Sequence, residues 1–105
     1  MIFELQRYDI KPGKMDAWIE FMDEVIVPFQ MSKGMVIPGC FFDAENNKYI
    51  WIRRFENEAE REEQYEAVYQ SEHWKNELSA KVGEMINRET IDVTRMQATP
   101  RSYIR

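Results

Sequence analysis

Apolar and polar residues alternate with a period of two in four segments of the chain, and this alternation predicts β-strands. The four predicted strands are residues 2–10, 35–43, 48–55 and 89–96. Pro38-Gly39 interrupts the second of them and predicts a β-bulge or an edge strand. Only residues 43–47 separate the second strand from the third, so these two strands are predicted to form a hairpin.

Two longer segments carry apolar residues at the spacing of amphipathic helices. In the first, the apolar stripe consists of Met15, Trp18, Ile19, Met22, Ile26 and Phe29. Pro28 predicts a kink in this helix, and Gly34 predicts its end. The second begins at Asn57, with Glu60 three residues later as in a capping box, and Ser71 can cap a further helical stretch. The order β-α-β-β-α-β predicts one ferredoxin-like α+β domain, an antiparallel sheet with its helices on one face.

The two faces of the predicted sheet differ in composition. We assign the aliphatic set to the face beneath the helices: Phe3, Leu5, Ile50, Ile52, Ile91 and Val93. The opposite set mixes aromatic and charged residues: Glu4, Gln6, Tyr8, Tyr49, Trp51, Arg53, Phe55, Asp92, Thr94 and Met96. A bare aromatic patch of this kind usually marks an interface or a binding site. The assignment therefore predicts a homodimer whose two sheets face each other and enclose a small-molecule cavity.

Composition narrows the classes of function. A net charge of −5 without a basic run disfavours binding to nucleic acid or to anionic membranes. A single cysteine, Cys40, cannot form an internal disulfide, which is typical of the cytoplasm. The N-terminal residues lack the features of a signal peptide, and the chain lacks an apolar run long enough to span a bilayer.

Several runs of residues resemble the NIPSNAP family over about residues 3–96. They are Phe3-Glu4-Leu5-Gln6-Arg7-Tyr8 with Lys11-Pro12-Gly13-Lys14, then Tyr49-Ile50-Trp51-Ile52-Arg53-Arg54-Phe55, then Tyr69-Gln70-Ser71-Glu72-His73-Trp74. The resemblance implies a dimeric α+β barrel, from a superfamily that includes cofactor-independent monooxygenases, small isomerases and haem-degrading enzymes. Gln6 stands where the family commonly has Arg, so Arg53 becomes the better candidate for an anion-binding cation.

The candidate site follows from the aromatic and charged face. We expect Tyr8 and Arg53 to carry any catalysis, Arg53 by holding an anionic or enolate oxygen and Tyr8 by a hydrogen bond to it. Trp51 would stack on a flat ligand. Further ligand-binding residues are Glu4, Gln6 and Asp92, in which the carboxylates either support a base or neutralise Arg53.

No metal and no cofactor is expected, because the single histidine, His73, has no co-ligand near it in the sequence and Cys40 has no evident base. Proton transfer next to a carbonyl and cofactor-free oxygenation of an electron-rich ring both fit the candidate residues. The alternative is a dimeric interaction module without catalysis. Whether the chain is an enzyme stays open at this point.

Overall fold

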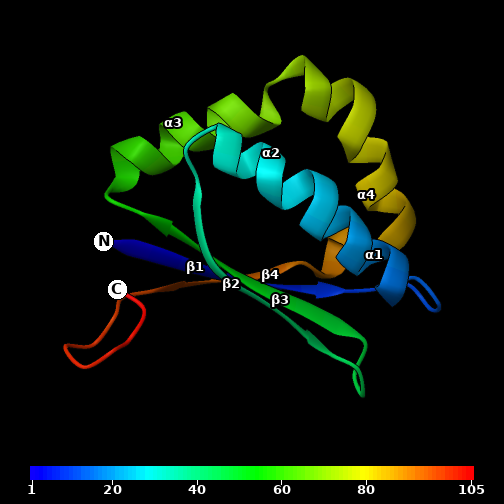
Figure 1. The fold of residues 1–105 in the computed structure, drawn as a ribbon, viewed down its shortest axis with the longest axis horizontal. Helices are drawn as coiled ribbons and strands as arrows, with labels where there is room; N and C mark the ends of the chain where they lie inside the picture. The colour runs from blue at the N-terminus through cyan, green and yellow to red at the C-terminus, as the bar shows by residue number, and fades with distance from the viewer.

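Four strands form a single antiparallel sheet, and every helix lies on the same face of that sheet (Figure 1). The computed structural model describes residues 1–105. The sheet order is β2-β3-β1-β4, with β1 at Ile2–Asp9, β2 at Val36–Asp43, β3 at Lys48–Phe55 and β4 at Asp92–Met96. The predicted ferredoxin-like order of elements is confirmed.

The first helical region contains an irregular turn just before its proline. It consists of α1 (Met15–Phe21), the π-helical segment η1 (Met22–Ile26) and α2 (Val27–Ser32). Pro28 has no N–H to donate to the preceding turn, and we attribute the wider π turn to this missing hydrogen bond. Gly34 follows the helix with φ at 98°, a conformation that suits glycine.

The second helical region begins with the cap that the sequence predicts. It consists of α3 (Glu58–Tyr69), the π segment η2 (Trp74–Leu78) and α4 (Ser79–Met85). The side chain of Asn57 accepts a hydrogen bond from the Glu60 N–H at 2.9 Å, and Ser71 Oγ accepts one from the Trp74 N–H at 3.1 Å. Both caps satisfy backbone donors that a helix start leaves free.

The hairpin of β2 and β3 closes as predicted. The Asp43 carboxylate accepts hydrogen bonds from the N–H groups of Glu45 and Asn46 at 3.1 and 3.2 Å. The pairing register shifts between Val36 and Gly39, which confirms the predicted bulge.

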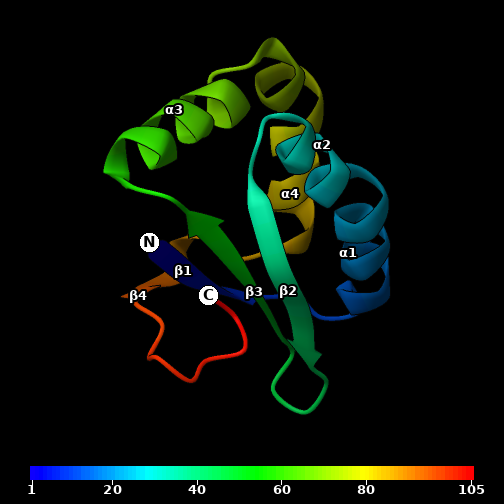
Figure 2. The same cartoon turned by 60° about the vertical axis from the view of Figure 1, so that its left-hand side comes forward.

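The last strand is shorter than the sequence predicts. Residues Arg88–Thr90 form a 3-10 turn, η3, and β4 begins only at Asp92. Beyond β4 the chain turns back under the sheet (Figure 2), where Ser102 and Ile104 line a hollow together with Phe3 and Ile52. The tail therefore covers part of the sheet face that the helices leave open.

Strands β1 and β3 turn the opposite face toward the helices from the one we assigned. Side chains paired across antiparallel strands lie on the same face, and the register joins Glu4 to Arg53, Gln6 to Trp51 and Tyr8 to Tyr49. All six side chains are buried, whereas Leu5, Ile50 and Ile52 lie on the open face and are only half-buried. The prediction that a second subunit covers the aromatic face is therefore wrong for these two strands, because the helices of the same chain cover it.

In β4 the assignment of faces is partly correct. Val93 pairs with Gln6 and lies on the helix face, as predicted. Asp92, Thr94 and Met96 pair with Arg7, Leu5 and Phe3, so they share the open face instead of the face of Glu4 and Tyr8. The predicted alternation within each strand is confirmed. The prediction of which residues of different strands share a face is wrong.

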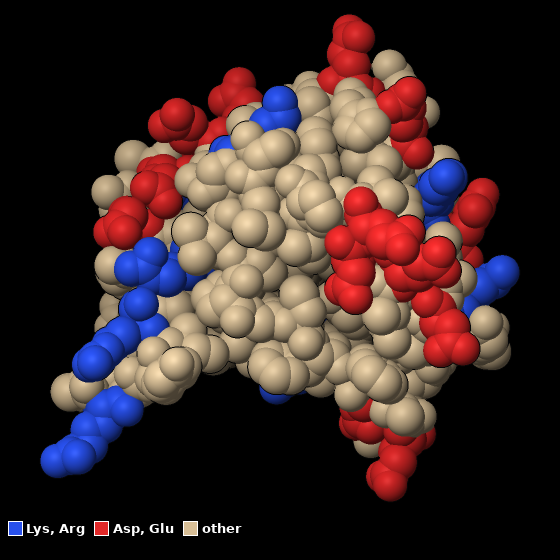
Figure 3. Space-filling view, viewed as in Figure 1, with Lys and Arg blue, Asp and Glu red and all other residues tan.

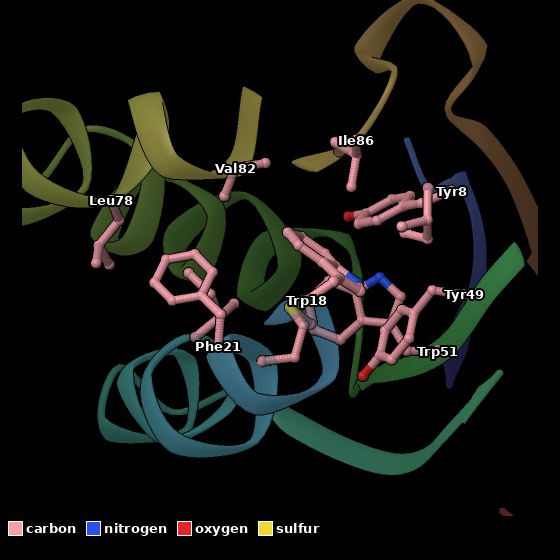
Figure 4. Packing of buried hydrophobic residues seen from close by; sticks show 11 residues of the cluster. Tyr8, Trp18, Phe21, Tyr49, Trp51, Leu78, Val82 and Ile86 are labelled. Carbon is pink, nitrogen blue, oxygen red and sulfur yellow. The ribbon is translucent and has the colours of Figure 1, made fainter. Parts of the chain in front are cut away.

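The main core joins the aromatic rings of the sheet to the first and last helices (Figure 4). The Trp18 ring on α1 packs edge to face with Tyr8 and Tyr49, at centroid distances of 5.8 and 5.9 Å. Leu78 and Val82 complete the cluster from the second helical region. No helix is of a length and apolarity that would let it cross a membrane.

Replacing Trp51 by Ala should lower the free energy of unfolding by about 3–5 kcal/mol, because it removes a fully buried ring from this core. The measurement is equilibrium unfolding in urea. Phe42→Ala is the control, since Phe42 is a largely exposed ring on β2 and its loss should cost about 0.5 kcal/mol or less. A similar loss in both variants would contradict the placement of Trp51 beneath the helices.

Candidate functional site

Four polar side chains are buried between the sheet and the helices: Glu4, Gln6, Gln30 and Arg53. Arg53 is 1% exposed, although its guanidinium stays charged at any physiological pH. A buried charge is stable only when it is paired and hydrogen-bonded. The surroundings of Arg53 therefore define the candidate site.

Arg53 directs its hydrogen bonds mainly at neutral oxygen atoms. Its Nη1 donates to the Tyr69 hydroxyl at 2.7 Å and to Gln30 Oε1 at 3.1 Å, and its Nη2 donates to the Tyr65 hydroxyl at 2.6 Å. The guanidinium also lies 4.9 Å from the Trp51 ring centroid and 4.8 Å from that of Tyr65. Burial alone would lower the pKa of Arg53, but the surrounding tyrosine oxygens outweigh burial and raise it.

One carboxylate, that of Glu4, serves two arginines. Its Oε1 lies 3.5 Å from Arg53 Nη2, and its Oε2 accepts a hydrogen bond from Arg61 Nε at 2.7 Å. Tyr65 donates its proton to Glu4 at 2.5 Å. Burial raises the pKa of the Glu4 carboxyl, but the hydrogen bonds from Tyr65 and Arg61 and the charge of Arg53 outweigh it, so the pKa lies below its usual value. Glu4 is thus a fixed anion.

Local structure explains how these groups meet. Glu4 and Arg53 are directly opposite each other on β1 and β3. Tyr65 and Tyr69 are four residues apart on α3, so they project from the same face of that helix, and their hydroxyls reach the guanidinium from above. Gln30 completes the set from α2. Each of the two helical regions therefore supplies partners to a charge in the sheet.

A cavity of about 270 Å³ lies beside this polar cluster. It is lined by Gln6, Tyr8, Arg53, Tyr65, Tyr69, Trp74, Val82, Ile86, Arg88, Ile91 and Val93. The volume is close to the lower end of the range for small-molecule sites, about 300–1,000 Å³. Its lining is mostly apolar or aromatic, with few polar groups. No Asp, Glu, His or Cys side chain lines it.

The tyrosine hydroxyls at the cavity act as hydrogen-bonding groups. Tyr8 donates to Gln6 Oε1 at 2.8 Å, and Gln6 Nε2 donates to Tyr65 at 3.4 Å. Burial raises the pKa of Tyr8 and of Tyr65 well above that of a free phenol. Both phenols stay protonated at neutral pH and cannot serve as bases there. The cavity can therefore orient and polarise a ligand, and it offers no side chain suited to remove a proton.

The structure brings most of the expected site residues together, though not where we expected them. Arg53, Tyr8 and Gln6 line the cavity within one chain, beneath the helices instead of between two sheets. Glu4 lies behind Arg53, and Trp51 stacks on its guanidinium without lining the cavity. Asp92 lies on the open face and pairs with Arg7 at 3.5 Å, so its assignment to this site is wrong.

The sequence analysis missed Tyr65, Tyr69, Trp74 and Arg88. The sequence did contain a signal for the role of the two tyrosines. The helix α3 is acidic, and its inner side presents two phenols four residues apart with little aliphatic surface. Hydroxyls on the inner side of a helix require polar partners in the sheet. Glu4, Gln6 and Arg53 are such partners.

The other reactive residues of the chain lie outside the cavity. His73 pairs with Glu77 and packs edge to face on Phe29, and Cys40 is exposed on β2. No group of three or more His, Cys, Asp or Glu side chains is arranged to hold a metal ion.

Comparison with solved structures shows the same fold in several bacterial proteins. A NIPSNAP family protein of unknown function from Agrobacterium tumefaciens matches with a TM-score of 0.88 at 20% identity, over 100% of this chain and 94% of that one. An uncharacterized NIPSNAP domain protein from Burkholderia xenovorans gives 0.84 at 13% identity, over 97% and 98%. At these identities the likeness shows the fold alone.

An antibiotic biosynthesis monooxygenase shares the fold less closely, with a TM-score of 0.69 at 18% identity over 95% of this chain and 100% of that one. No curated protein sequence matches the chain. The family model named NIPSNAP matches residues 3–100, nearly the whole length. The chain belongs to the NIPSNAP family.

Proposed function

We propose that the protein binds a small, mainly apolar molecule in the cavity beneath α3 and α4 and stabilises negative charge on one oxygen of that molecule. The observation that carries this proposal is a fully buried guanidinium, Arg53, at the wall of a largely apolar cavity that is partly open to solvent. A buried charge interacts strongly with a polar group bound next to it, since little water lies between them to screen the interaction.

The charge balance of the cluster favours a ligand oxygen that carries negative charge. The cavity wall holds two cationic side chains, Arg53 and Arg88, and no carboxylate. Glu4 only partly compensates Arg53, because Arg61 makes the shorter contact with its carboxylate. An enolate, a phenolate or a strongly polarised carbonyl oxygen would complete the balance.

Two kinds of chemistry pass through an anionic oxygen that this site could hold, and in both the solvent would have to take the proton from the ligand, since no side chain of the cavity is suited to do so. One is proton transfer next to a carbonyl, and the other is cofactor-independent oxygenation of an electron-rich ring. Likeness of fold to an antibiotic biosynthesis monooxygenase supports the second. In either case the contribution of this chain would be electrostatic stabilisation and orientation, because no suitable base lines the cavity. The unpaired cysteine, Cys40, supports a cytoplasmic setting.

We also propose that two copies associate through the open sheet face. Such a dimer is compatible with ligand binding in the cavity, and without a ligand it would make the protein a dimeric interaction module. The accessible apolar residues of this face are Leu5, Phe41, Ile50, Ile52 and Met96, and its charged and polar residues include Arg7, Arg54, Asp92 and Thr94. Phe41 is 53% exposed and pairs with Ile50 on this face, so the two belong to one apolar patch, and such patches often mark interaction sites. The proposed interface is thus mainly aliphatic with one phenylalanine ring, and it differs from the interface of tyrosine, tryptophan and arginine that the sequence predicted.

The shape and charge of the open face support a second copy as its occupant. In Figure 3 the underside is hollowed between two projections of opposite charge. The basic projection coincides with the C-terminal tail of Figure 1, which contains Arg101 and Arg105. The acidic projection coincides with the β2–β3 turn, which contains Asp43 and Glu45. A two-fold arrangement would bring the tail of one copy toward the turn of the other.

Ligand binding should raise the melting temperature of the wild type, because a ligand that binds only the folded state stabilises it. The measurement is a thermal-shift screen of small aromatic and unsaturated acids, enols and ketones. Ile91→Trp should abolish the shifts by filling the rim of the cavity, whereas Met31→Trp, an exposed position on α2, should keep them. Equal shifts in both variants would show that the ligands bind elsewhere.

The double variant Arg101→Glu/Arg105→Glu should weaken dimerisation about tenfold or more at low salt, because four charges reverse in a two-fold dimer. Sedimentation equilibrium provides the measurement. Adding Glu45→Arg to the same chain should restore part of the affinity, since the charges then match better, and Asp43 is kept because its carboxylate holds the turn. A wild type that remains monomeric at micromolar concentration would refute the proposal, as would a failure of Glu45→Arg to compensate.

A further inference from the structure

We infer that the ligand is a flat hydroxy- or oxo-carboxylic acid of about one ring, with its hydroxyl or keto oxygen held at Tyr69 and Arg53 and its carboxylate at Arg88. This inference rests on the proposed function and specifies the class of molecule that the cavity takes. It depends on the Tyr69 proton, which the protein leaves unused at the buried end next to the charge of Arg53, and on a fixed cation at the exposed end.

At the buried end, Tyr69 holds a proton that its protein neighbours cannot accept. Its hydroxyl oxygen accepts hydrogen bonds from Arg53 Nη1 at 2.7 Å and from Gln30 Nε2 at 3.4 Å, and both of these neighbours are donors. Tyr69 donates to no protein acceptor, in contrast to Tyr65, which donates to Glu4, and Tyr8, which donates to Gln6. Because Tyr69 lines the cavity, its proton is available to a ligand oxygen.

Arg53 strengthens the hydrogen bond that Tyr69 can donate to a ligand. Its Nη1 donates to the Tyr69 hydroxyl at 2.7 Å, so the Tyr69 oxygen lies against a buried positive charge. The Nη atoms of Arg53 are otherwise taken up by Gln30, Tyr65 and Glu4. An acceptor oxygen that received the Tyr69 proton would therefore be held by a donor polarised by a charge, and any negative charge on that oxygen would be stabilised.

At the exposed end, Arg88 is held in place against α4. Its Nη2 donates to Ser79 Oγ at 3.0 Å and also to the Ser79 carbonyl oxygen. The guanidinium lies over Gly83, where a side chain would begin only 3.4 Å from Arg88 Nε. Because Arg88 is exposed and lines the cavity, a carboxylate can pair with it without the large desolvation cost of burial.

Between the two ends the walls are apolar. Trp74, at the start of the π segment η2, faces the cavity together with Val82, Ile86, Ile91 and Val93. Such walls suit the faces of a ring and give it no further polar contact. The expected ligand therefore has one polar group at each end and an apolar body.

Three probes separate the two ends: 4-hydroxybenzoate has both groups, benzoate lacks the hydroxyl, and 4-hydroxybenzamide lacks the charge. Dissociation constants are measured by NMR titration. The wild type should bind 4-hydroxybenzoate about three- to tenfold more tightly than either other probe, the usual effect of one hydrogen bond. Tyr69→Phe should remove the preference over benzoate and keep the preference over the amide. Arg88→Gln should do the reverse.

Lys11→Gln is the matched control for charge, because Lys11 also contacts α4, through the Gly83 carbonyl at 2.8 Å, but does not line the cavity. It should leave both preferences unchanged. If Tyr69→Phe does not fold, the preference of the wild type for 4-hydroxybenzoate over benzoate still tests the buried end.

A wild type that binds all three probes equally, or variants that weaken all three equally, would overturn the ligand class. The ligand class is also overturned if none of these probes binds while other molecules stabilise the wild type but not Ile91→Trp. In that case the proposed function would stand. If no small molecule in the screen stabilises the wild type, the proposed function itself fails.

Discussion

The burial of the Arg53 guanidinium beneath the helices is the constraint on which the rest of the structure depends. A permanent charge removed from water requires partners with good geometry, and removing one partner of such a pair is far more costly than breaking a surface contact. The partners come from β1, α2 and α3 through Glu4, Gln30, Tyr65 and Tyr69. Pairing the charge therefore fixes both helical regions over the sheet, and the apolar core around Trp18 packs next to this arrangement.

The same arrangement creates the chemical character of the cavity. Most of the polar groups are satisfied within the protein, as the contacts of Tyr8 and Tyr65 show. The Tyr69 proton has no protein acceptor, and Tyr69 lines the cavity. Tyr69 and Arg53, which stabilise the fold, would thus also hold a ligand. Their hydrogen bonds to other protein groups fix their positions before a ligand binds.

The two faces of the sheet separate two tasks. The face beneath the helices contains the charge, the phenols and the cavity, and it is closed by the same chain. The open face carries an apolar patch around Leu5, Ile50 and Ile52 and is only partly covered by the C-terminal tail, so it is suited to assembly. Because adjacent residues of a strand point to opposite faces, Trp51 can contribute to the first task while Ile50 and Ile52 serve the second.

The sequence by itself determined the order and most boundaries of the elements, because their signals are local. The Asn57 cap, the perturbation at Pro28 and the Pro38-Gly39 bulge all depend on neighbouring residues. Only the tertiary structure decided which sheet face the helices cover. A period of two divides the residues into two sets without showing which set is inside. The cost of burying Glu4, Gln6 and Arg53 depends on Gln30, Tyr65 and Tyr69, which are remote in sequence and become partners only when the chain folds.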